Sequence, residues 1–213
     1  VKDANEISFY YADGLVGFSD DSEFVQEILQ GIDKKYLGFE FGVEAQIIPT
    51  VKLKGAASIG QYTYDNNPYL YLGADDYTVA VGPSNLENYK LAGGPQRAYS
   101  YGFEYRDPDY WFIGVTSNFF TNTYVDISPL TRTQNFYLSQ DGLPFNDYDV
   151  SVARDLLKQE KFENYMVMNM IGGKSWKIDN YYVGFFASIN NILDKKYRTG
   201  GFEQGRNANY QQL

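Results

Sequence analysis

The chain has 213 residues, a net charge of −9, and neither cysteine nor histidine. It therefore cannot form a disulfide, a thiol nucleophile, a zinc finger or a histidine-based catalytic centre. The negative charge argues against a general nucleic-acid surface, and no apolar run approaches the length of about 18 residues that a transmembrane helix needs.

The first predicted strands are residues 4–14, 25–48 and 51–65. Between residues 36 and 60 nearly every second residue is apolar, and the short break in this pattern contains Pro49, which has no N–H for a strand ladder. Side chains of a strand alternate between two faces, so one face here is apolar and the other carries Gly, Glu, Gln and Lys. Two antiparallel strands joined by a tight turn fit this pattern better than a helix, which would scatter the charges around its circumference.

The same alternation predicts two further hairpins, formed by residues 97–106 with 109–121 and by residues 162–176 with 181–195. Their turns are expected at 107–109 and 177–180. The loop between the two hairpins contains a short predicted helix at 151–162, with Val152 and Leu156 on its inward face.

Short and long connections alternate along the chain. The turns after Ile48, Arg106 and Lys177 have two to four residues, whereas residues 65–96 and 122–161 form long connections. Loops beyond about 12–15 residues are uncommon in compact domains. Transmembrane β-barrels instead combine short periplasmic turns, long extracellular loops and many interfacial aromatic residues. The 18% aromatic content, with 21 Tyr and 15 Phe, fits this class.

The predicted fold class is therefore all-β, an antiparallel transmembrane β-barrel segment whose apolar face meets lipid and whose polar face meets a lumen. The predicted lipid-facing residues are Leu37, Phe39, Phe41, Val43, Leu53, Tyr101, Phe103, Trp111, Ile113, Val183 and Phe185. Two alternatives stay open, a complete small barrel of eight strands and a soluble β-sandwich, which also alternates. In a sandwich, Phe39, Phe41, Tyr101 and Phe185 would converge in a sealed interior.

Several segments also resemble a known family. They are "GIDKKYLGFEFGVEAQ" (31–46), "YVDISPLTRT" (124–133), "GGKSWKI" (172–178) and "SINNILDKKYRTGGFEQGRN" (188–207). These segments resemble the last part of the barrel in TonB-dependent outer-membrane receptors of the Bacteroidetes type. The resemblance covers most of the chain, and the last segment is similar to the penultimate strand and last long loop of that family.

The resemblance implies a 22-stranded barrel closed by an N-terminal plug. About seven strands are predicted here, and an open sheet of seven would leave unpaired edges in lipid. Residues 1–213 are thus expected to be the C-terminal part of one transmembrane barrel domain, without its plug and final strand. The implied location is the Gram-negative outer membrane. The implied partners are outer-membrane lipid, the inner-membrane TonB energy complex through the missing N-terminal part, and a surface lipoprotein or another outer-membrane protein.

Candidate ligand-binding residues lie in two predicted extracellular loops. They are Tyr124, Asp126, Arg132 and Tyr137 in the first loop, and Arg198, Glu203 and Arg206 in the last. Aromatic rings and guanidinium groups at a barrel mouth could hold an anionic or aromatic ligand. Alternatively, Arg132 pairs with Asp126 inside the loop.

Other features predict no chemistry. The acidic loops at 11–14, 19–23 and 73–76 lack the spacing of a calcium loop, and we expect them to be solvated, with no metal bound. The Gly-rich stretches at 92–95 and 199–205 do not lie between a strand and a helix, as phosphate loops do. No cofactor and no enzymatic activity are expected.

Three functions follow. The first is uptake of a scarce nutrient by a TonB-dependent receptor, with energy from the inner membrane. The second is an outer-membrane barrel that serves as a structural or partner scaffold without transport. The third is a soluble β-sandwich binding module.

Overall fold

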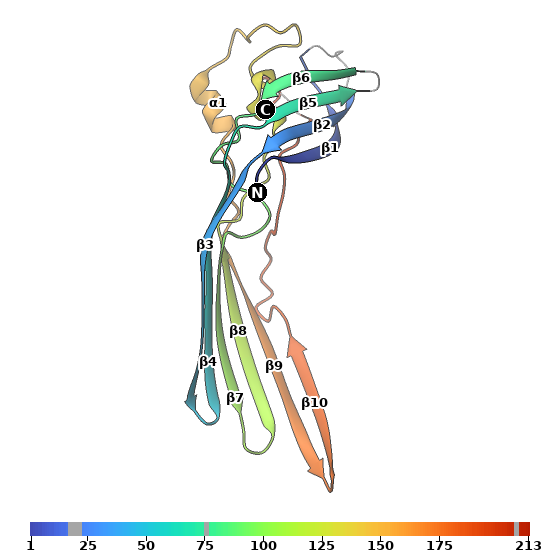
Figure 1. Cartoon of the computed structure of the whole chain (residues 1–213). Helices are drawn as coiled ribbons and strands as arrows, with labels where there is room; N and C mark the ends of the chain where they lie inside the picture. Colours follow the sequence, from blue (N-terminus) through green and yellow to red (C-terminus); the bar gives the residue numbers. More distant parts are fainter. Residues whose placement is uncertain (17–22, 75–76, 207–208) are drawn as a thin grey trace.

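Two antiparallel β-sheets lie end to end in the computed structural model of the chain (Figure 1). The structure describes residues 1–16, 23–74, 77–206 and 209–213. These residues form ten strands and only short helices, which confirms the predicted all-β class. No helix within the described ranges is long and apolar enough to cross a bilayer.

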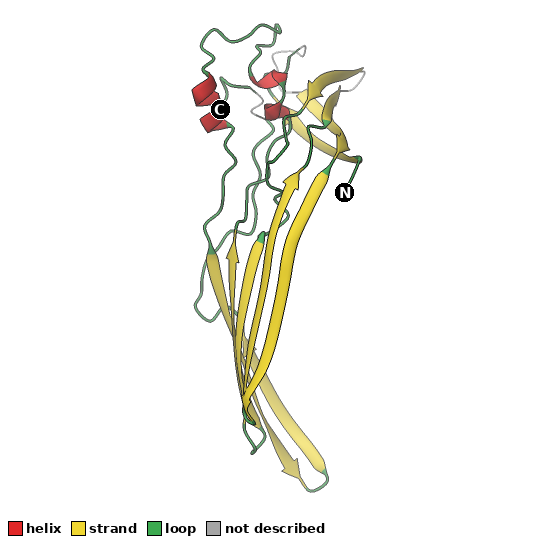
Figure 2. Cartoon of the chain, turned by 60° about the vertical axis from the view of Figure 1, so that its left-hand side comes forward, coloured by secondary structure: helices red, strands yellow, loops and turns green. Residues whose placement is uncertain are grey.

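The larger sheet has six strands in the order β10-β9-β8-β7-β4-β3. Their bounds are β3 (Lys34–Ile48), β4 (Val51–Tyr64), β7 (Arg97–Arg106), β8 (Trp111–Thr121), β9 (Tyr165–Ile178) and β10 (Tyr181–Ile189). Three hairpin turns, at 49–50, 107–110 and 179–180, gather at one end of this sheet, which we call the turn end (Figure 1). The opposite end, which we call the loop end, carries the long connections and the helices of the described residues (Figure 2). The three predicted hairpins are thus confirmed.

The register of the β3–β4 pair places apolar or small residues opposite one another on one face and charged residues opposite one another on the other face. Phe41 faces Ala57 and Val43 faces Gly55 on one side of the β3–β4 pair, whereas Glu44 faces Lys54 on the other side. Glu44 also forms an ion pair of 2.7 Å with Lys52 on this polar face. A slip of one residue would exchange the two faces, so the alternation in the sequence fixes the register.

The six-stranded sheet has no apolar core of its own. Strand β10 has no buried residue, and Phe39 and Phe185 remain 65% and 67% exposed. Ten of the eleven residues predicted to face lipid are exposed, and Ile113 is partly covered. Phe39, Phe41, Tyr101 and Phe185 therefore do not converge in a sealed interior, and the two sheets do not stack face to face (Figure 2).

The smaller sheet has four strands in the order β1-β2-β5-β6. Their bounds are β1 (Ala4–Ala12), β2 (Glu23–Ile32), β5 (Tyr69–Ala74) and β6 (Tyr77–Pro83). Strand β2 continues into β3 with only Asp33 between them, so one chain segment belongs to both sheets. Asp33 accepts hydrogen bonds from the Asp3 amide (2.9 Å) and the Lys2 ammonium (2.8 Å), and its own amide donates to Asn66 (2.9 Å). These bonds hold the junction between the sheets.

The apolar core of the described residues lies at the loop end. Val25, Leu29 and Ile32 of β2 pack with Leu70 and Leu72 of β5, and all five side chains are almost fully buried. The 3₁₀-helix η1 (Leu130–Arg132) contributes Leu130 to this core, and the 3₁₀-helix η2 (Gln134–Phe136) contacts β6 beside it. The helix α1 (Val150–Leu156) also lies at the loop end (Figure 2).

Two predictions about strands were wrong. The structure has ten strands among its described residues, not about seven, because the predicted strand 25–48 divides at Asp33 and the predicted loop 65–96 contains β5 and β6. The hairpin was missed because Tyr69 and Tyr71 alternate with buried Leu70 and Leu72. Tyrosine on the solvent side hides the period-two pattern.

The predicted helix at 151–162 ends early, at Leu156, and buries Ala153 rather than Val152 or Leu156. Tertiary hydrogen bonds explain its end. The Gln159 side chain donates to the carbonyls of Lys90 (2.8 Å) and Val125 (2.9 Å), which holds the following segment extended.

Candidate functional site

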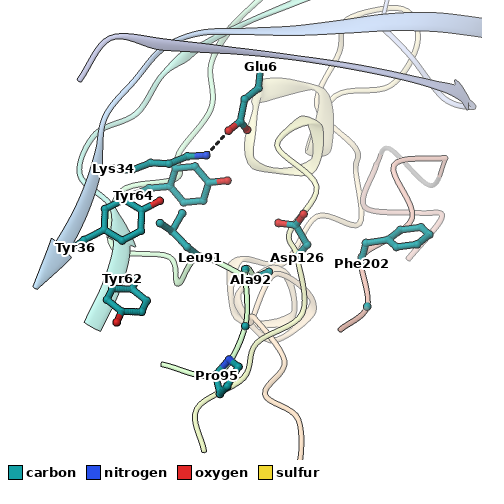
Figure 3. A pocket seen from close by; sticks show the side chains of 13 residues that line it. Glu6, Lys34, Tyr36, Tyr62, Tyr64, Leu91, Ala92, Pro95, Asp126 and Phe202 are labelled. Carbon is teal, nitrogen blue, oxygen red and sulfur yellow. Dashed lines mark hydrogen bonds and ion pairs between the residues drawn. The ribbon is translucent and has the colours of Figure 1, made fainter. Parts of the chain in front are cut away.

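A cavity of about 700 Å³ opens where the two sheets meet, which we call the junction cavity (Figure 3). Its lining comes from six separate parts of the chain: Glu6 of β1, Lys34 and Tyr36 of β3, Tyr62 and Tyr64 of β4, loop 91–95, Asp126, and residues 201–202. Cavities of this size accommodate small organic ligands.

Three tyrosines form one wall of the junction cavity. Tyr36 and Tyr62 are directly opposite in the β3–β4 register, with ring centroids 5.4 Å apart. Because both have the same parity as Glu40 and Ser58, they stand on the polar face of the sheet. The third ring, Tyr64, is largely buried. Strand alternation therefore directs aromatic surface into the cavity.

A lysine and a glutamate form the upper rim in the view of Figure 3. The Lys34 ammonium forms an ion pair with Glu6 and lies 5.6 Å from the centroid of the Tyr64 ring. The charge of Lys34 is therefore neutralised within the protein, and a ligand would compete with Glu6 for it.

Asp126 lies across the cavity from the tyrosines (Figure 3). Its backbone is fixed by pairing with the last loop, since its amide donates to the Gly201 carbonyl (2.9 Å) and its carbonyl accepts from the Glu203 amide (2.8 Å). Although the residue is exposed at the cavity wall, desolvation by the surrounding protein raises the pKa of its carboxyl, and the nearby charge of Glu6 raises it further. Within the described ranges Asp126 forms no ion pair.

A second cavity of about 580 Å³ adjoins the first and shares Glu6, Tyr64, Asp126 and Phe202 with it. Glu27 of β2, which is 5% exposed, contributes to its lining. Its carboxyl accepts hydrogen bonds from the Tyr10 hydroxyl (2.6 Å) and the Ser8 hydroxyl (3.3 Å). Burial raises the pKa of Glu27, and these two hydrogen bonds oppose that rise only in part.

Glu27→Gln is expected to make folding stability at neutral pH independent of the ionisation of residue 27, which destabilises the wild-type protein there. Because the folded pKa of Glu27 lies above the ordinary value of 4.5, the unfolded chain ionises first as pH rises. The wild-type protein therefore loses stability from about pH 4.5 up to the folded pKa, and this loss persists above it. Unfolding of the four-stranded sheet at pH 4 and pH 8 measures the effect. A pH dependence as large in Glu27→Gln as in the wild type would contradict the assignment.

Arg132 lies behind the wall of the second cavity and binds Glu203, which lines it. Its side chain is 2% exposed and forms a two-pronged ion pair with Glu203, in which Nη2 donates to Oε1 at 2.8 Å. The same nitrogen donates to the Leu157 carbonyl (3.0 Å), and the guanidinium lies 5.0 Å from the Tyr89 ring. The alternative pairing of Arg132 with Asp126 is not formed. Arg132 instead fixes the last loop against the segment that contains Asp126.

The structure brings only some of the predicted ligand-binding residues together. Asp126 lines both cavities and Glu203 lines the second. The remaining four residues lie elsewhere. Tyr124 is partly buried and its backbone pairs with Lys161, Tyr137 is exposed beside Tyr148, Arg198 lines a separate cavity, and Arg206 pairs with Asp13 at 2.8 Å.

Of the lining of the junction cavity, sequence reasoning singled out Asp126 but missed the ion-paired rim and the tyrosine wall, formed by Glu6, Lys34, Tyr36, Tyr62 and Tyr64. Tyrosines at polar-face positions near the loop end of two adjacent strands were the available signal, because the rest of the polar face of β3 and β4 carries mainly small and charged residues. The ion pair of Lys34 with Glu6 joins two sheets and has no local signature.

The acidic loops contribute little to the described site. Residues 19–22 and 75–76 lie outside the described residues. In the part of the chain that the structure describes, no group of three acidic side chains is arranged to hold a metal ion.

The arrangement can offer a ligand aromatic ring faces, a carboxylate that forms no ion pair among the described residues although the charge of Lys34 opposes the rise in its pKa, and a lysine already engaged by a glutamate. These groups suit binding. Comparisons of the chain with protein-family models, with curated proteins and with solved structures each found no match.

Proposed function

We propose that the chain is part of an outer-membrane TonB-dependent receptor that takes up a scarce nutrient with energy from the inner membrane. The observation that carries this proposal is the six-stranded sheet, whose apolar face is exposed, while the opposite face of β3 and β4 carries charged and small residues. Soluble monomers rarely expose contiguous apolar patches of more than a few hundred Å². A lipid environment would cover this face.

Strand length supports the same proposal. The strands of the sheet contain between 9 and 15 residues. A tilted transmembrane strand needs about 9–11 residues, so each strand is long enough to cross a bilayer. The sheet is open, with β3 and β10 at its edges. Unpaired edges do not occur in hydrocarbon, so the proposal requires neighbouring strands, which a 22-stranded barrel would supply.

The turn end has the residues expected at a membrane boundary. Both tryptophans of the chain lie near it, Trp111 at the start of β8 and Trp176 close to the end of β9. Lys174 is opposite Trp111 and Phe185 on the apolar face, and its ammonium donates to the Asp109 carbonyl at 2.5 Å. Tryptophan belts and lysines that extend toward the interface are typical of membrane boundaries.

A second candidate, a partner scaffold without transport, is favoured by one surface. The outer face of the four-stranded sheet exposes Ile7, Phe9, Tyr11 and Phe24, with the Phe9 and Phe24 rings stacked at 6.3 Å. A surface lipoprotein or another outer-membrane protein would find apolar contacts there. Transport and scaffolding differ in whether solute enters the cell.

The proposed topology predicts opposite labelling of the two ends of the sheet. Because the chain has no cysteine, a single introduced cysteine reports its own position. In whole cells, a membrane-impermeant maleimide is expected to label Asp141→Cys, in an exposed loop, but not Asn180→Cys, in the β9–β10 turn. After cell lysis both variants are expected to react. Equal labelling in intact cells would contradict the topology.

Uptake separates transport from scaffolding. A deletion strain and its parent are grown on a defined nutrient mixture, and depletion of each component is followed by mass spectrometry with and without an uncoupler. The proposal expects one component to be depleted only by energised cells that contain the protein. Unchanged depletion of every component in the deletion strain would favour the scaffold.

A further inference from the structure

We propose that the junction cavity binds the cationic end of a ligand that also carries a ring or apolar face, with Asp126 as its counter-charge. This inference concerns the binding site of the proposed receptor and rests on the proposed function only for its position at the outer mouth of a pore. The cavity itself is formed by the described residues of this chain.

The charges around the cavity favour a cation over an anion. Lys34 is engaged by Glu6, and Arg132 is buried behind the wall and engaged by Glu203. Asp126 has no ion pair within the described ranges. An anionic ligand would have to displace an existing carboxylate, whereas a cation gains a new partner without breaking any pair.

The aromatic wall suits the same ligand. A cation within about 6 Å of a ring centroid is attracted by the ring's electron-rich face. Lys34 already lies in this position over Tyr64, at 5.6 Å. Tyr36 and Tyr62 offer two more rings on the same side of the cavity, and their faces can also cover an apolar ring of the ligand.

The position of Asp126 between the two cavities strengthens its attraction for a ligand cation. It lines both adjoining cavities, so a cationic group placed at Asp126 leaves room for the rest of the ligand on either side. Partial desolvation, which raises the pKa of this carboxyl, also lowers the local screening of its charge. A ligand cation is therefore attracted more strongly here than at an open surface. Binding is expected to weaken as the pH falls through the pKa of Asp126.

Three probes of similar size and different charge test the inference: 2-phenylethylammonium, 2-phenylethanol and phenylacetate. Their binding to the purified full-length protein in detergent is measured by titration calorimetry at pH 7.5. The cation is expected to bind at least tenfold more tightly than either analogue. No binding of the cation, or equal binding of all three probes, would overturn the inference.

Variants assign the effect to the cavity. Asp126→Asn keeps the shape of the residue and is expected to weaken binding of the cation about tenfold or more, as for the loss of one charge-assisted contact. Asp141→Asn removes the same charge from an exposed loop outside the cavity and is expected to leave binding unchanged. Equal binding by Asp126→Asn and the wild type would overturn the assignment.

A second pair tests the aromatic wall. Tyr62→Leu is expected to weaken binding of the cation, whereas Tyr62→Phe, which retains the ring, is expected to preserve it. Equal weakening in both variants would show that the aromatic ring of Tyr62 does not contribute to binding of the cation. Heat-modifiable gel mobility checks that each variant is folded. Probe binding without energised uptake would sustain this inference and contradict the proposed function, so the two can fail separately.

Discussion

In the proposed transmembrane barrel, Phe41→Arg is expected to destabilise the fold by about 2–4 kcal/mol, the cost of arginine on a lipid face near the bilayer midplane. Phe41 lies near the middle of β3, is 55% exposed, and faces Ala57 on the apolar side of the sheet. Its side chain can therefore only meet whatever covers that face. Urea titration of the full-length protein in lipid vesicles, followed by heat-modifiable gel mobility, measures the change in free energy.

The adjacent residue supplies a matched control. Glu40 is next to Phe41 in the same strand but points to the opposite face, where it accepts a hydrogen bond of 3.4 Å from Ser58. Glu40→Arg introduces the same side chain into the polar face and is expected to cost much less, and Glu40→Gln is expected to be tolerated. Equal destabilisation by Phe41→Arg and Glu40→Arg would mean that the two faces have been assigned wrongly.

Arg132→Met is expected to destabilise the loop end locally by up to about 3 kcal/mol, the lower end of the cost of breaking a buried ion pair, because Glu203 would lose its partner but is itself 26% exposed. Glu203 would lose its guanidinium partner, and the Leu157 carbonyl would lose a hydrogen bond. The segment that contains Glu203 forms part of the cavity lining, so it should open more often. Hydrogen exchange of the Glu203 amide, which donates to the Asp126 carbonyl, reports this opening directly.

A second arginine in the same region serves as the control for Arg132. Arg206 forms an ion pair of 2.8 Å with Asp13, but its side chain is 58% exposed. Exposed pairs contribute at most about 1 kcal/mol. Arg206→Met should therefore accelerate exchange of the Glu203 amide far less than Arg132→Met does. Similar acceleration in the two variants would show that the buried pair has no special role in holding the cavity wall.

The first pair of variants tests the two faces of β3, which arise from local sequence, and the second tests the ion pair of Arg132 with Glu203, which joins distant segments. The two faces of β3 and β4 follow from alternation over a few residues and from the turn at Pro49, so they were predictable. Of the candidate ligand residues, Asp126 and Glu203 lie at the cavities, whereas Arg132, which sequence reasoning assigns to ligand contact or to a pair with Asp126, does not line either of them. The structure buries Arg132 against Glu203, 71 residues away along the chain.

The sequence alone determined the all-β class, the three hairpins and the division of β3 and β4 into an apolar and a polar face. Each of these depends on side-chain alternation and turn chemistry, which act between residues close in the chain. The tertiary structure decided the second sheet, the change of sheet at Asp33 and the junction cavity. These features depend on pairings between distant segments, such as Asp126 with Phe202 and Lys34 with Glu6, and no local periodicity encodes which distant segments meet.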